Sequence, residues 1–155
     1  MNVTASLSRN LPEDRRQMVA NTDRMLSMID SAVAGAAPFL PVKLVVFPEF
    51  AHAAPIHATP AELLRTLAVR IPNEHTDRLG AKARAHDIYI QSGTMLEVVP
   101  RWPYGVLNTT CLIGPGGILS GYQRVTPWIP CEVHASRHDL PGYDEPLFPV
   151  VDTPI

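Results

Sequence analysis

Cysteine is scarce in this chain: two of its 155 residues are cysteine. Two cysteines cannot form the disulfide framework of a small secreted protein. The first residues show no basic segment followed by an apolar one, so the sequence predicts no signal peptide. Both absences favour a protein of the reducing cytoplasm.

Long apolar runs and an excess of positive charge are also missing. No window approaches the roughly 18 uninterrupted apolar residues that a membrane helix needs. The net charge is −2 and the pI is near 6.3, so the charge balance favours neither nucleic acid nor an anionic membrane as a partner. We therefore expect no membrane and no nucleic-acid contact.

The composition that remains is that of a globular protein, with 46% hydrophobic and 18% charged residues. The length suits one domain with a real core, so we treat residues 1–155 as a single domain. Sixteen prolines predict a chain rich in loops, above all after position 96.

A short β-branched run at residues 42–47 predicts a buried strand. Pro48 lacks an amide donor and ends it, which leaves Glu49 at the strand's carboxyl end, where α/β sheets usually carry their chemistry. Phe47, Pro48 and Phe50 favour a partly desolvated setting for this carboxylate.

Helical and strand patterns alternate along the rest of the chain, which predicts an α/β fold. We expect helices from about residue 11 to 35, from 60 (capped by Thr59 with Glu62) and over 73–86, and strands over 2–7, 88–96, 106–113, 118–124 and 147–151. The apolar helix positions predicted to face the core are Met18, Met25, Leu26, Ile29, Val33, Leu79, Ala83 and Ala85, and the polar face of the first helix carries Arg15, Arg16, Asp23 and Arg24.

A second stretch, residues 121–132, runs from a strand into a proline-rich loop. It carries Arg124, Trp128 and Glu132. We expect these side chains and Glu49 to face one pocket.

Five segments, in this order and spacing, carry a resemblance to a known family: Val45–Glu49, Tyr89–Gly93, Leu107–Thr110, Gly114–Gly117 and Tyr122–Val125. Together they resemble the nitrilase superfamily, the carbon–nitrogen hydrolases, and especially its amidase branch. The resemblance implies an α-β-β-α sandwich, a small-molecule amide or nitrile substrate and no cofactor.

The resemblance also implies roles for single residues. Glu49 matches the general base, Arg124 takes the position of a lysine that steadies the tetrahedral intermediate, and Glu132 matches a further glutamate of the amidase branch. Trp128 would form part of the substrate-binding wall. Arginine keeps the positive charge of lysine but differs in geometry and does not give up a proton.

The family's nucleophilic cysteine follows a Thr-Pro-Ile-Gly-like segment, and this sequence stops within such a segment, at Asp152–Ile155. We therefore expect an incomplete, truncated sandwich that is inactive alone. Its uncovered sheet predicts marginal solubility or a homo-oligomer. The alternative is a non-catalytic derivative that keeps the fold for binding or assembly.

The cysteines and histidines suggest a third hypothesis, a small metal or thiol site. Cys111 lies in an apolar strand and is expected to be a buried, unreactive thiol. Cys131, His134 and His138 have a spacing that suits a metal or thiol site, although three ligands without a second cysteine pair make no complete zinc site, so we predict no metal. Solvated or capping roles are expected for the other histidines, His52, His57, His75 and His86.

Overall fold

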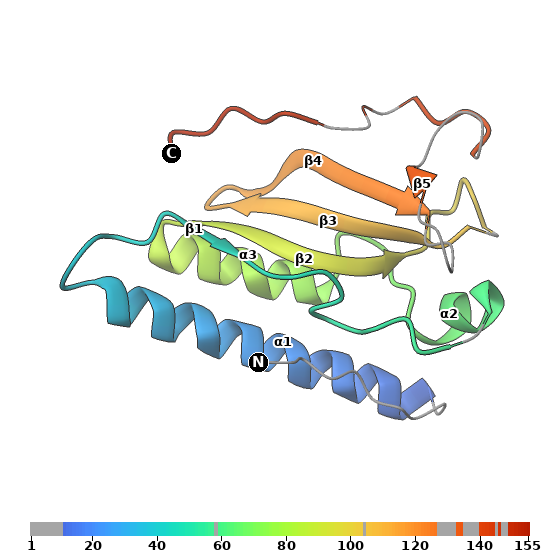
Figure 1. The fold of residues 1–155 in the computed structure, drawn as a ribbon, viewed down its shortest axis with the longest axis horizontal. Coiled ribbons are helices and arrows are strands. Elements are labelled where there is room, and N and C mark those ends of the chain that lie inside the picture. Colours follow the sequence, from blue (N-terminus) through green and yellow to red (C-terminus); the bar gives the residue numbers. More distant parts are fainter. Residues whose placement is uncertain are drawn as a thin grey trace.

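A computed structural model describes residues 11–57, 59–103, 105–126, 133–134, 140–144, 146 and 149–155, with the backbone alone for 11–12, 60, 119–126 and 133–134. Its elements follow the order α1 (Leu11–Ala36), β1 (Leu44–Val46), α2 (Pro60–Thr66), α3 (Glu74–His86), β2 (Tyr89–Glu97), β3 (Leu107–Gly114), β4 (Gly117–Thr126) and β5 (Val133–His134) (Figure 1). The protein is thus of the mixed α/β class.

The strands form one sheet in the order β1-β2-β3-β4-β5. β1 and β2 are parallel, whereas β2–β3, β3–β4 and β4–β5 are antiparallel. The carboxyl ends of β1, β2 and β4 and the amino end of β3 therefore lie at the same end of the sheet, as the arrowheads in Figure 1 show. The side chains of the candidate site lie at this end of the sheet.

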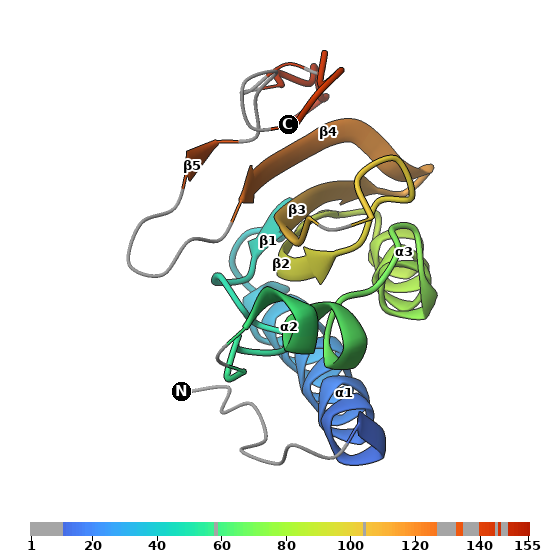
Figure 2. The same cartoon turned by 90° about the vertical axis from the view of Figure 1, so that its right-hand side faces the viewer.

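Helices α1 and α3 cover one face of the sheet (Figure 2). The core between these layers is made of buried side chains from both helices, from β2 and β3, and from the segments next to β1 and β2: Met25, Ile29, Phe47, Ala51, Leu79, Ala83, Ile88, Ile90, Cys111 and Ile113. This confirms the inward positions predicted for the helices, except Ala85, which is exposed.

Local signals set the helix starts. The Thr59 side chain accepts a hydrogen bond from the Glu62 amide, and the Glu62 carboxylate accepts one from the Thr59 amide, which confirms the predicted capping box of α2. Asn73 caps α3 by accepting from the amides of His75 and Thr76. Both caps satisfy amides that have no partner within the helix.

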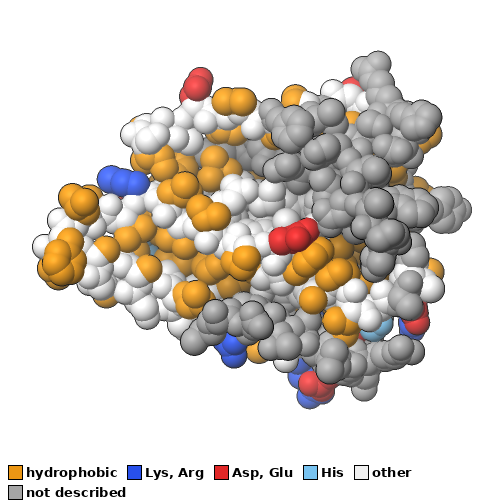
Figure 3. Space-filling view, in the orientation of Figure 1, with side chains coloured by type: hydrophobic (Ala, Val, Ile, Leu, Met, Phe, Trp, Pro, Cys, Tyr) orange, Lys and Arg blue, Asp and Glu red, His pale blue; other side chains and the backbone are white. Residues whose placement is uncertain are grey.

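The expectation that the strand at residues 42–47 is buried is wrong. Leu44 is 46% and Val46 64% exposed, because no described residue packs over the side of the sheet from which these two side chains extend. Apolar side chains are also frequent over the face shown in Figure 3. A run of apolar residues predicts a strand but not whether a second layer packs on it.

Arg15 also departs from its predicted place on the polar face of α1. It is half-buried, and its Nη2 donates to the Ala68 carbonyl at 2.9 Å, so it ties α1 to the end of α2. Burying the aliphatic part of a long charged side chain while its head bonds a carbonyl is favourable.

Two further expectations concern the ends of the chain, and a third concerns membrane-spanning helices. The strand predicted over 2–7 lies outside the described residues. Residues 149–151 form no strand, and 147–148 also lie outside the described part. Within the described residues, no helix is long and apolar enough to cross a membrane.

Candidate active site

Glu49 lies in the turn that directly follows β1. The Phe47 amide still donates to the Gln91 carbonyl at 3.1 Å, and the ladder then stops at Pro48, which has no amide to donate. The sequence thus predicted the place of Glu49 correctly. Its side chain is nevertheless exposed, because the turn carries it away from the core, and the partly desolvated setting is not found.

The turn around Glu49 is tightly specified. Gly93 on β2 has φ +71°, and a Cβ there would lie 2.5 Å from the Pro48 carbonyl oxygen, so only glycine fits. Phe50 has φ +54°, which is rare for an aromatic residue, and its amide donates to Thr94 Oγ1 at 2.8 Å. Backbone strain of this kind is often kept at functional sites.

Asn108 orients the Glu49 carboxylate. Its Nδ2 donates to Glu49 Oε1 at 2.6 Å, across 59 positions of the chain. Asn108 is the second residue of β3 and only 2% exposed, so its amide is held by packing. A hydrogen bond to an ionised oxygen from a fixed donor is among the stronger ones in proteins.

The backbone of Arg124 lies close to this pair. In the β3–β4 ladder Arg124 is opposite Thr109, and Val125 is opposite Asn108. Thr109 Oγ1 in turn donates to Glu97 Oε2 at 2.7 Å, and both of these side chains are buried. One end of the sheet therefore gathers Glu49, Glu97, Asn108 and Thr109 with the Arg124 backbone.

The structure does not describe all of the other residues that were predicted to form the site. Trp128 and Glu132 lie outside the described residues, as do Cys131 and His138 of the alternative metal or thiol site. Among the described residues no group of three or more His, Cys, Asp or Glu is placed to hold a metal ion. Cys111 is fully buried in β3, as predicted.

The histidines contradict the expectation of solvated or capping roles. His52, His57 and His75 are 0%, 3% and 2% exposed. His57 Nε2 lies 3.0 Å from Asp14 Oδ2, in the first turn of α1. His86 is partly exposed and pairs with Asp30 at 2.8 Å. Each has a specific partner far along the chain, which local sequence cannot show.

Burial changes the protonation of two of these groups. Desolvation, and then the proximity of His75, lowers the pKa of His52 from 6.5 to about 4. Desolvation also lowers the pKa of His75, although Glu74 opposes it. Both rings are therefore neutral at pH 7.

Two residues of this end were not predicted as site residues, and a signal existed for each. Glu97 follows the strand of residues 88–96 as Glu49 follows its own strand, so the same argument applied. Asn108 is a polar residue at the start of an apolar strand, inside a segment that carried the family resemblance.

Comparison with known proteins supports the resemblance. The sequence profile of the carbon–nitrogen hydrolase family matches residues 9–155. Among solved structures, Nit3 of Saccharomyces cerevisiae, a member of branch 10 of the nitrilase superfamily, shares the fold with a TM-score of 0.55 and 22% identity over 69% of this chain. An N-terminal amidase, solved with an Asn-Glu-Ala peptide, gives a TM-score of 0.56 and 18% identity over 70% of this chain.

Both structures are much longer than the part that matches. The matched region is 38% of the Nit3 chain and 24% of the amidase chain. At these identities the likeness concerns the fold alone.

Proposed function

Because the chain belongs to the carbon–nitrogen hydrolase family, we propose that it forms the glutamate-bearing part of a site that hydrolyses amides or nitriles. The observation that carries the proposal is the Glu49 carboxylate, which stands at the carboxyl end of β1 and is oriented by Asn108 at 2.6 Å. A base must be held in a fixed direction to take a proton efficiently, and this contact provides that.

In the proposed reaction Glu49 takes the proton of a thiol, and the thiolate attacks the amide or nitrile carbon. Arg124 would donate to the oxygen or nitrogen on which negative charge develops. With an amide, the protonated Glu49 gives this proton to the leaving amine as the carbon–nitrogen bond breaks. With a nitrile, the proton goes to the nitrogen of a thioimidate, and addition of water with loss of ammonia gives the same acyl-enzyme. Glu49 then takes a proton from a water molecule that attacks the acyl-enzyme, and returns it to the departing thiolate. Glu132 and Trp128 would complete the substrate pocket.

The thiol is the part that the described residues do not offer. Cys111 is fully buried in the core, where a substrate cannot reach its thiol. The proposal therefore assigns the attack to a cysteine that follows the Asp152–Ile155 segment in a longer protein, within the complete α-β-β-α sandwich of the family.

The exposed edge of the sheet supports a proposal about assembly. Leu44 and Val46 on β1 leave apolar surface at an open strand edge, which favours pairing with another chain. We propose that the 155-residue chain by itself forms homo-oligomers in the cytoplasm, and that a small-molecule amide or nitrile is the substrate of the complete site.

The test is ammonia release by the product of the complete reading frame, measured on a panel of aliphatic amides, nitriles and carbamoyl amines. We expect turnover that Glu49→Gln lowers by roughly 100-fold or more. Arg124→Lys should retain or raise it, which serves as the matched control at the cation position.

A non-catalytic derivative is the second candidate, and arginine at the lysine position is the observation that favours it. A stop codon directly after Ile155, together with no turnover by the purified chain, would support this candidate over the hydrolase.

A further inference from the structure

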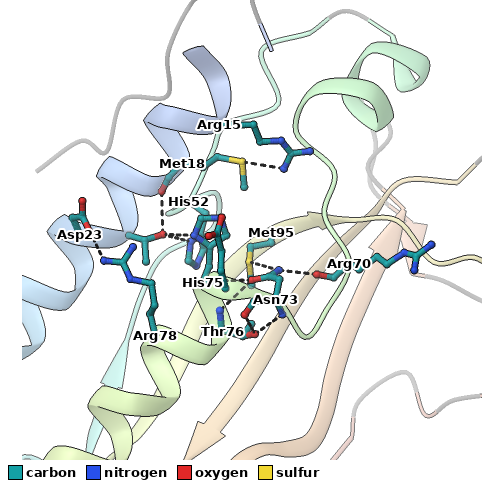
Figure 4. Close-up of polar contacts among 12 residues, drawn as sticks. Arg15, Met18, Asp23, His52, Arg70, Asn73, His75, Thr76, Arg78 and Met95 are labelled. Atoms are coloured by element: carbon teal, nitrogen blue, oxygen red, sulfur yellow. Dashed lines mark hydrogen bonds and ion pairs between the residues drawn. The ribbon is translucent and has the colours of Figure 1, made fainter. Parts of the chain in front are cut away.

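His52 connects the Glu49 turn to the body of the protein. It follows Glu49 by three residues and is fully buried. Its carbonyl accepts from Asn21 Nδ2 of α1 at 2.8 Å. Its ring, shown beside His75 in Figure 4, has Nδ1 3.2 Å from Thr22 Oγ1 and Nε2 3.2 Å from the Ser92 carbonyl. One side chain thus joins the turn to α1 and β2.

Thr22 extends this connection to α3. Its Oγ1 lies 2.9 Å from His75 Nδ1, and the two imidazole rings are 5.5 Å apart between centroids. Thr22 is fully buried and His75 is 2% exposed. A single hydroxyl therefore bridges two buried histidines from different parts of the chain.

The positions of the hydrogens follow from the acceptors. The Ser92 carbonyl can only accept, so His52 Nε2 carries the hydrogen. A neutral imidazole has one N–H, which leaves His52 Nδ1 as an acceptor of the Thr22 hydroxyl. The Thr22 oxygen then accepts from His75 Nδ1–H. With both rings neutral, the arrangement in which each of these ring nitrogens has a hydrogen-bond partner runs from His75 to Thr22 to His52 to Ser92.

Thr22 also has a second acceptor. Its Oγ1 lies 3.0 Å from the carbonyl of Met18, one turn earlier in α1. A proton on His52 Nδ1 would turn this nitrogen into a donor, and the Thr22 hydroxyl would have to swing to Met18. The hydroxyl thus has two settings, selected by the charge of His52.

The charged side chains around the two rings disfavour the protonation that would turn the Thr22 hydroxyl to Met18. Arg15 of α1 and Arg78 of α3 both disfavour positive charge on His75, which lies against His52. The acid among these neighbours is Glu74, whose Oε1 is 3.7 Å from His75 Nε2 and whose side chain is 71% exposed. No titratable side chain comes from β2 at this contact, where Ser92 supplies only its carbonyl.

We propose that Thr22, His52 and His75 form a proton-ordered latch that holds the Glu49 turn while both rings are neutral, and that one proton on His52 reverses the Thr22 hydroxyl and loosens the turn. The latch itself does not depend on the role of Glu49. Only an effect of the loosened turn on Glu49 as a base would rest on the proposed function.

The direct test is long-range ¹H–¹⁵N NMR of the histidine rings in the ¹⁵N-labelled protein. At pH 7 we expect His52 as the Nε2–H tautomer and His75 as the Nδ1–H tautomer. Thr22→Ser should keep both, because the hydroxyl remains, whereas Thr22→Val should release His75 from the Nδ1–H form. Thr66→Val is the matched control, since Thr66 is equally buried but bonds the Glu62 carbonyl and no histidine.

A second readout follows the turn during acidification. The Phe50 amide, which bonds Thr94, should exchange with solvent about tenfold faster, after correction for intrinsic rates, in the same pH step in which His52 gains its proton. The latch proposal is contradicted by the opposite tautomer on either ring at pH 7. It is also contradicted if the exchange rate of the Phe50 amide does not change when His52 gains its proton. These readouts need no turnover, so failure of the hydrolase proposal would appear separately, as an activity that Glu49→Gln leaves unchanged.

Discussion

Asn108 and Glu49 are joined by a hydrogen bond of 2.6 Å although 59 positions separate them in the chain. Asn108 comes from the buried start of β3 and Glu49 from the exposed turn after β1. The contact gives the carboxylate a defined direction at the end of the sheet, which makes Asn108 a positioning residue for the proposed base.

Replacing Asn108 by aspartate tests this contact through stability. At pH 7 two carboxylates would meet, one of them buried, so Asn108→Asp should lower the free energy of unfolding by about 3 kcal/mol. Urea unfolding at pH 7 measures this. Asn108→Ala is the control, with a loss of about 2 kcal/mol, because it removes the donor without adding a charge. A loss for Asn108→Asp no larger than that for Asn108→Ala would contradict the contact.

Gly93→Ala should be strongly destabilising. The new Cβ would lie 2.5 Å from the Pro48 carbonyl oxygen at a φ of +71°, so the Glu49 turn or β2 must shift. We expect a loss of roughly 2 kcal/mol or more in thermal or urea unfolding. Gly35→Ala is the matched control: nothing lies within 4 Å of its Cβ, and in α1 it should stabilise by about 0.5 kcal/mol. Similar effects of the two changes would argue against the close approach.

Acid should destabilise the protein through His52. Because burial lowers the folded-state pKa of His52 from 6.5 to about 4, the unfolded chain binds the proton more tightly than the folded one. The stabilisation is complete above pH 6.5 and declines as pH falls toward 4, by about 3 kcal/mol in total. His52→Gln removes the titrating ring, so its unfolding free energy should fall less between pH 7 and pH 4.5. Parallel pH curves for the two proteins would refute this.

The buried Asp14–His57 pair should be strongly coupled. Its atoms lie 3.0 Å apart and both side chains are almost fully inaccessible, so removing either partner leaves a buried polar group alone. We expect Asp14→Ala to cost about 3 kcal/mol, and the double variant with His57→Ala to cost clearly less than the sum of the single changes. Asp23→Ala, which breaks the exposed Asp23–Arg78 pair, should cost less than about 1 kcal/mol. Additive losses at Asp14 and His57 would show that the two side chains do not interact.

The sequence predicted the features that depend on nearby residues. The start of α2 followed from Thr59 and Glu62, which contact each other within one turn, and the stop of β1 followed from Pro48 alone. The family resemblance drawn from five short segments is confirmed by the profile match over residues 9–155.

Features that depend on distant partners were not predicted. His52 and His75 were expected in solvent because nothing beside them in the sequence reveals Thr22, which approaches only when α1 packs on the sheet. The exposure of Val46 is a similar case, since a short apolar run in the sequence does not show whether one or both faces of the strand are covered. Asn108 could be recognised as a polar residue in an apolar strand, but its contact with Glu49 needed the fold.

The most direct measurement of the central claim is a crystal structure that shows the side chains of Glu49 and Arg124 together. Neighbouring residues of a strand extend from opposite faces of a sheet, so the face from which Arg124 leaves β4 decides whether it can reach the carboxylate. We expect the guanidinium and the carboxylate to line one cavity, with Glu132 beside them. A guanidinium on the face of the sheet opposite to Glu49 would contradict it.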